Sequence, residues 1–173
     1  MFFFKLFDAQ VEPVLLYSSE LWGLKDCSLV ESVHLQALKR FLHLPSQTPN
    51  IMAYGETGRY PISITAKLRV VKYWLRILQM DTYRFTRKVY NMMLQSTKSN
   101  WASDVQNLLC SYGFEELWRL QRVENPASFL RDLRGRLIAE FVQNWSVKLV
   151  GSMRYEFYRQ FKSVFNRVTF ALC

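Results

Sequence analysis

The stretch that most constrains this chain is residues 48–80, where a dense group of turn residues gives way to a strongly patterned helix. Gly55, Gly58 and Pro61 fall within seven positions, which predicts a turn rather than a helix or a central strand. After Pro61, apolar residues recur every three or four positions and basic residues lie opposite them. We therefore expect an amphipathic helix over 62–80, with the other helices packed around it.

This predicted helix carries four basic residues, Lys67, Arg69, Lys72 and Arg76. Helical geometry places the last three on one side and Lys67 toward the apolar side, where an ammonium group is costly unless its stem reaches solvent or an anion meets it. Residues 62–100 hold eight basic and one acidic residue, which accounts for most of the chain's net charge of +9. This concentration predicts contacts with the phosphates of a nucleic acid; the alternative is a solvated helix face.

The apolar spacing predicts an all-α protein, a multi-helix bundle in two helical halves with no sheet. Half of the 173 residues are apolar, which is ample for a core. The polar segment 95–100 is the expected linker between the halves 1–94 and 101–173. The helices expected beside 62–80 are 2–24 with a break or kink at Pro13, 28–43, 82–94, 101–110, 114–123, 128–149 and 152–166.

The sequence offers little catalytic chemistry, and we expect no catalytic residue, no metal site and no cofactor. His34 and His43 are the two histidines, and nine positions along one helix put them on opposite sides, where they cannot share a metal ion. Neither the G-x-G-x-x-G spacing nor the P-loop spacing of phosphate-binding glycines is present. Ser28 and Glu31 form an S-x-x-E capping box that opens the helix over 28–43. The five tryptophans could stack on bases, but their helical spacing beside Leu and Phe favours packing in the core.

The spacing of the cysteines and the first ten residues of the chain indicate the cellular compartment. Cys27, Cys110 and Cys173 are far apart and form no C-x-x-C motif, so we expect no structural disulfide and a reducing environment. The opening MFFFKLFDAQ contains charges and lacks a cleavage site, which argues against a signal peptide and a membrane span. We therefore expect an intracellular protein, cytoplasmic or nuclear, that is not secreted and has no membrane partner.

The segment VEPVLLYSSELWGL at 11–24 carries a motif. With VHLQALKRFLHLPSQTPN, YGETGRYPI and K-x-R-x-x-x-YW after it, it resembles the region after the polymerase core in reverse transcriptases of non-LTR, LINE-type retrotransposons. A thumb helix in that family ends in P-x-L-x-Y-G-x-E-x-W, and a second helix ends in a K/R-R-x-L-type pattern. The first pattern matches Pro13, Leu15, Tyr17, Glu20 and Trp22, with Ser18 at the usual glycine, and the second matches Lys39, Arg40 and Leu42. The resemblance covers residues 7–78 well and, more loosely, the later spaced tryptophans and YRQFK at 158–162.

The resemblance implies a thumb-like region over 1–94 whose role is to hold an RNA template or an RNA/DNA template–primer duplex. The family's F/Y-x-D-D polymerase turn and any endonuclease signature are absent from this sequence. We therefore expect a catalytically empty fragment, not an enzyme itself, of an RNA-directed DNA polymerase whose core is a missing partner. Its surface for that core is expected to support self-association.

Two other interpretations remain open. The chain could be a helical protein–protein interaction module without nucleic-acid binding, in which exposed aromatic residues dock another helix. It could also bind a membrane surface peripherally through 62–80, although that helix lacks the aromatic and basic pattern of interfacial helices. The dependence of binding affinity on salt concentration distinguishes the first alternative from nucleic-acid binding. Contacts with phosphates weaken steeply as the salt concentration rises, whereas apolar docking hardly changes.

Overall fold

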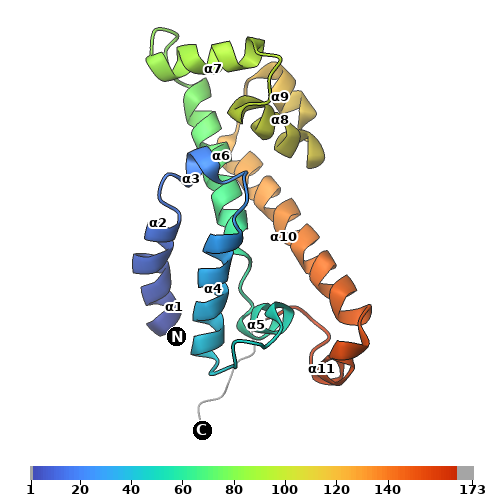
Figure 1. Cartoon of the computed structure of the whole chain (residues 1–173). Coiled ribbons are helices and arrows are strands. Elements are labelled where there is room, and N and C mark those ends of the chain that lie inside the picture. The colour runs from blue at the N-terminus through green and yellow to red at the C-terminus, as the bar shows by residue number, and fades with distance from the viewer. Residues whose placement is uncertain (1, 167–173) are drawn as a thin grey trace. The chain divides into compact units, whose positions relative to one another are not determined.

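The computed structural model describes residues 2–166, and all the regular structure in that range is helical, which confirms the predicted all-α class (Figure 1). None of the described helices is both long enough and apolar enough to span a bilayer. The elements are α1 (Phe2–Leu6), the π-helical turn η1 (Phe7–Val11), α2 (Glu12–Leu15), α3 (Ser19–Trp22), α4 (Ser28–Phe41), α5 (Asn50–Thr57), α6 (Ile62–Leu78), α7 (Phe85–Gln95), α8 (Trp101–Ser111), α9 (Glu115–Leu120), α10 (Pro126–Val150), the 3₁₀ turn η2 (Met153–Tyr155) and α11 (Glu156–Phe161).

The chain forms two compact units whose sequences interleave, and α6 and α10 run from one unit into the other. Unit 1 comprises the described parts of 1–15, 28–64 and 137–173, and unit 2 comprises 16–27 and 65–136.

These units differ from the predicted halves 1–94 and 101–173, because each unit draws on both. The expected linker 95–100 lies inside unit 2, where Asn100 caps α8: its side chain accepts hydrogen bonds from Ala102 N and Ser103 N. Compactness does not measure whether a part folds alone, so the predicted boundary remains a prediction.

Unit 1 is built around aromatic side chains from α1, α4, α5 and α10. The rings of Phe4 and Phe41 lie 4.2 Å apart between centroids, and the Tyr54 and Phe141 rings meet edge to face at 5.4 Å. Such pairs add to the free energy of apolar burial. The buried residues of this core are Phe4, Leu35, Leu38, Ala53 and Tyr54.

The predicted turn at residues 55–61 is wrong in its first part, because Gly55 lies inside α5. A Cβ at this position would lie 2.7 Å from the hydroxyl of Tyr158 and 3.0 Å from Cζ2 of Trp145. The glycine therefore serves close packing within a helix. Gly58 does end the helix, with φ 62° at its C-cap, a left-handed conformation that glycine adopts without steric cost.

Unit 2 has its own aromatic core around Trp74, which is fully buried. Its ring stacks on Trp118 with 6.0 Å between centroids and meets Phe129 edge to face. The Trp74 indole donates to the Tyr90 hydroxyl at 2.9 Å, and that hydroxyl donates to Oε1 of Gln121 at 2.6 Å. This chain of bonds satisfies polar atoms that would otherwise be costly to bury.

The expected helix over 2–24 is interrupted, and the interruptions have physical causes. Pro13 cannot donate to the carbonyl four residues before it, and the π-helical turn η1 occupies the segment just upstream. The chain turns at residues 16–18, where Ser18 has a left-handed φ of 53°. Gly23 follows α3 with φ −64° and lies close to the backbone oxygen of Ala66.

Candidate nucleic-acid interface

The helix that carries the predicted site, α6, is buried along most of its length in unit 2. Val70, Val71 and Trp74 have no exposed surface. The helix has a wide apolar side and a narrow solvent-facing side, as its sequence pattern indicates. Charged side chains on this helix therefore have few directions in which they reach water.

Lys72 and Arg76 are the exposed members of the predicted set. They lie one turn apart, at i and i+4, where Cβ atoms are about 5–6 Å from each other. Among the described residues, no carboxylate lies within ion-pair distance of either side chain. Like charges at this spacing destabilise a helix by about 0.2–0.5 kcal/mol, so the two charges do not stabilise α6 through each other.

Arg69 and Lys67 differ from this pair. Arg69 is half-buried, and its Nη1 donates to the backbone carbonyl of Leu16 at 2.9 Å. Its guanidinium thus fixes the segment before Ser18 onto α6, within unit 2. Lys67 is also half-buried, and no described carboxylate forms an ion pair with it. Only Lys72 and Arg76 of the four residues are both exposed and adjacent.

The same unit exposes further cations that were not assigned to the predicted site. Arg84 and Lys88 are exposed at the start and in the first turn of α7, one helical turn from each other, and Lys98 is exposed after that helix. Arg87 between them is half-buried and donates to the carbonyl of Ile77 at 3.3 Å. The excess of basic residues over 62–100 is the sequence signal that could have added Arg84, Lys88 and Lys98 to the predicted site.

Residues 17–22, the later part of the motif segment 11–24, form a defined local structure in unit 2. Across the turn at Ser18, the indole Nε1 of Trp22 donates to the carbonyl of Tyr17 at 3.0 Å. The indole of Trp101 on α8 donates to the carbonyl of Glu20 at 2.9 Å. The motif residues therefore close a tight turn and attach it to a neighbouring helix.

In unit 1, the Glu31 side chain on α4 forms hydrogen bonds with several segments of the chain. Its carboxylate accepts hydrogen bonds from the Tyr54 hydroxyl at 2.5 Å, from Nδ1 of His34 at 3.1 Å, and from the amides of Ile62 and Ser63 at 3.2 and 3.3 Å. Burial raises the pKa of Glu31, but the hydrogen bonds from His34 and Tyr54 outweigh it, so the pKa lies below its ordinary value. Burial and the neighbouring carboxylate raise the pKa of Tyr54.

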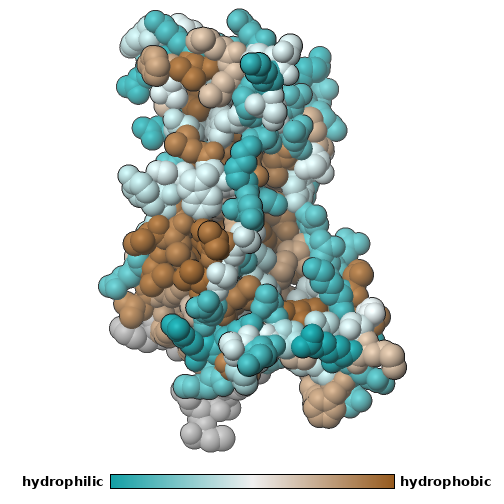
Figure 2. Space-filling model, viewed as in Figure 1, coloured by the Kyte–Doolittle hydropathy of each residue, from teal (hydrophilic) through white to brown (hydrophobic). Residues whose placement is uncertain are grey.

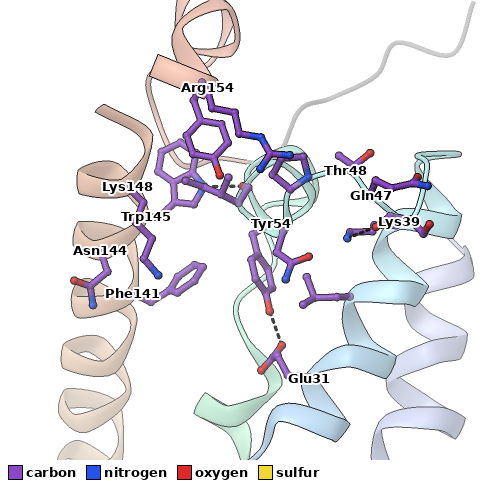
Figure 3. Close-up of a pocket in the computed structure, with 16 residues that line it drawn as sticks. Glu31, Lys39, Gln47, Thr48, Tyr54, Phe141, Asn144, Trp145, Lys148 and Arg154 are labelled. Carbon is purple, nitrogen blue, oxygen red and sulfur yellow. Dashed lines mark hydrogen bonds between the residues drawn. The ribbon is translucent and has the colours of Figure 1, made fainter. Parts of the chain in front are cut away.

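Unit 1 also contains a pocket of about 750 Å³ that no sequence motif indicated (Figure 3). Figure 3 shows Tyr54 between two groups of side chains, with Lys148 and Trp145 on one side and Lys39 on the other. Trp145 is held in place because its Nε1 donates to the carbonyl of Ile51 at 2.8 Å. The pocket is lined by Glu31, Leu35, Lys39, Ser46, Gln47, Thr48, Pro49, Asn50, Ile51, Tyr54, Phe141, Asn144, Trp145, Lys148, Arg154 and Tyr155.

The described residues contain no group of three or more His, Cys, Asp or Glu side chains that could hold a metal ion. His34 is buried against the rings of Phe7 and Tyr54, whereas His43 is exposed. Cys173 lies outside the described residues, so nothing follows about its pairing. Of the tryptophan indoles, four donate to protein atoms, which accords with structural roles for them.

No protein-family model, no curated protein and no solved structure matches this chain.

Proposed function

We propose that this chain binds RNA or an RNA/DNA duplex without sequence specificity, as the thumb-like region that follows the polymerase core of a LINE-type reverse transcriptase. The observation that carries the proposal is the exposed, unpaired couple of Lys72 and Arg76 on the buried helix α6. In this role the chain performs no polymerase chemistry, and the active site that it serves lies on another part of the parent enzyme.

The physical basis is the release of counterions from the phosphate backbone. Each lysine or arginine that neutralises a phosphate contributes affinity that does not depend on base sequence. A rigid helix presents such cations at a fixed spacing, because Val70, Val71 and Trp74 hold α6 in the core. A region that must follow any duplex being copied needs this kind of contact.

The motif supplies separate support for the family. The position at which the family usually has glycine is Ser18 here, and it adopts φ 53°, a conformation that glycine reaches without the cost that other residues incur. The glycine position of the family pattern therefore coincides with a left-handed backbone conformation in this chain, which glycine adopts most easily.

A charge-reversal experiment tests the proposal. We expect Lys72→Glu/Arg76→Glu to keep its helical circular-dichroism signal and to lose on the order of tenfold in affinity for a fluorescently labelled RNA/DNA duplex at modest salt. The matched control is Arg131→Glu/Arg134→Glu, which makes the same change in net charge at exposed positions of α10 in the same unit. Equal affinities for wild type and the Lys72/Arg76 variant would refute the assignment.

A second candidate function, a protein-interaction module, is favoured by one apolar surface in unit 1. Figure 2 shows hydrophobic residues gathered over the first helical segments. The exposed residues there include Leu6, Val11 and Val14, and Leu29 and Val33 are exposed on α4. Exposed apolar patches of this kind mark interaction surfaces.

Sedimentation velocity tests the second candidate. If this surface mediates association, the wild-type chain forms dimers or larger species, and Val14→Ser/Leu29→Ser shifts it toward the monomer. A wild-type chain that stays monomeric at high concentration would rule out self-association through this face.

A further inference from the structure

The pocket in unit 1 brings together three basic residues from three separate segments. Lys39 comes from α4, Lys148 from the last turns of α10, and Arg154 from η2. Figure 3 shows the Lys148 and Arg154 side chains beside Trp145, and Lys39 across the pocket from them. Lys148 and Arg154 are exposed, and no described carboxylate forms an ion pair with either.

The pocket carries a net positive charge, because three basic residues line it and Glu31 is the single acidic residue of its lining. The Glu31 carboxylate accepts hydrogen bonds from Tyr54 and from the amides of Ile62 and Ser63. Lys39 donates one bond to the carbonyl of Ser46 at 2.9 Å, and an ammonium group has three protons to donate. An anion that enters the pocket therefore meets cationic groups that still have protons to donate.

The walls of the pocket indicate a ligand that is larger than a phosphate ion and partly apolar. Phe141 and Trp145 line one side with the apolar atoms of Ile51, and the Trp145 indole is fixed by its bond to the Ile51 carbonyl. A volume of about 750 Å³ lies within the range of small-molecule sites, whose walls combine apolar surface with a few placed polar groups. A phosphate alone would leave most of this space and all of the aromatic wall unused.

We propose that this pocket binds a nucleotide, with the phosphate at Lys148 and Arg154 and the ring against Phe141. The site goes beyond the duplex interface on α6, because it lies in the other unit and uses different residues. A lipid headgroup also carries a phosphate, attached to glycerol. The aromatic wall favours a nucleotide over such a headgroup, because glycerol has no ring to pack against it.

The test follows the indole N–H of Trp145 by ¹H–¹⁵N NMR in the whole chain, with the resonance assigned by triple-resonance experiments. The probes are AMP, adenosine, inorganic phosphate and glycerol 3-phosphate. We expect AMP to shift this resonance and to bind more tightly than the three others. Lys148→Glu and Arg154→Glu should each weaken AMP binding on the order of tenfold, whereas Lys5→Glu, an exposed control outside the pocket in the same unit, should leave it unchanged.

Several outcomes would overturn the proposal. They are the absence of a Trp145 shift with AMP, equal AMP affinity in Lys148→Glu and wild type, and equal binding of glycerol 3-phosphate and AMP. The duplex interface is tested separately, because Lys72→Glu/Arg76→Glu should leave AMP affinity intact. Loss of duplex binding with retained AMP binding, or the reverse, therefore shows which site has failed.

Discussion

The Glu31 carboxylate on α4 and the Tyr54 hydroxyl on α5 lie 2.5 Å apart, although the residues are 23 positions apart in sequence. The same carboxylate accepts from the amides of Ile62 and Ser63, the first residues of α6. A negative charge is favoured at a helix N-terminus, because the unpaired N–H groups and the helix dipole both face it. One side chain thus joins α4, α5 and the first residues of α6, all of which belong to unit 1.

The lowered pKa of Glu31 predicts a specific dependence of stability on pH. Its ordinary value is 4.5, and because the folded pKa is lower, ionised Glu31 stabilises the fold above about pH 4.5. This contribution is lost as the pH falls through the folded pKa. We therefore expect the difference in unfolding free energy between wild type and Glu31→Gln to shrink as the pH falls below about 4.5.

Urea unfolding of both proteins at a series of pH values measures that difference. Glu124→Gln is the control, since Glu124 is an exposed glutamate in unit 2 and should behave as wild type throughout. A difference for Glu31→Gln that stays the same into strongly acidic solution would show that the carboxylate is not held in its ionised form by these bonds.

Ser18→Gly should stabilise the chain. Ser18 has φ 53°, where a Cβ is strained, so glycine relieves strain worth about 1–2 kcal/mol while the unfolded chain gains flexibility that offsets part of it. We expect a net gain of about 0.5–1 kcal/mol in unfolding free energy. Ser99→Gly, at an exposed position without positive φ, should give no gain, and a loss of stability in Ser18→Gly would contradict the strain argument.

Two glycines should respond to alanine in opposite directions. A Cβ at Gly23 would lie 2.6 Å from the backbone oxygen of Ser19 and 2.9 Å from that of Ala66, whereas a Cβ at Gly135 meets nothing within 4 Å. Gly23→Ala should cost about 1–3 kcal/mol through overpacking, and Gly135→Ala should add about 0.5–1 kcal/mol through helix propensity. Thermal unfolding of the two variants measures both shifts, and shifts of the same sign would contradict these environments.

The sequence predicts best what depends on neighbouring residues. The helix Ile62–Leu78 follows from apolar and basic spacing within its own segment. Helix α5 does not follow from its sequence, because Gly55 allows close contacts with Trp145 and Tyr158. A glycine in a sequence indicates backbone flexibility and gives no information about such packing. A local pattern carries no information about partners that folding brings from far along the chain.

The same limit applies to the candidate sites. Lys72 and Arg76 could be placed together because both lie on one helix, but the partner of Arg69, the carbonyl of Leu16, lies 53 positions away. The nucleotide pocket has no sequence signature at all, since Lys39 and Lys148 come from α4 and α10. Cations at these positions look like ordinary surface residues until the helices are assembled.

The dependence of duplex affinity on salt tests the phosphate contacts of Lys72 and Arg76 most directly. Each cation that neutralises a phosphate adds about one to the magnitude of the slope of log affinity against log salt. We predict that Lys72→Gln/Arg76→Gln lowers that magnitude by about two relative to wild type, while Arg131→Gln/Arg134→Gln leaves it unchanged. A slope for Lys72→Gln/Arg76→Gln identical to that of wild type would show that the two residues of α6 do not contact the nucleic acid.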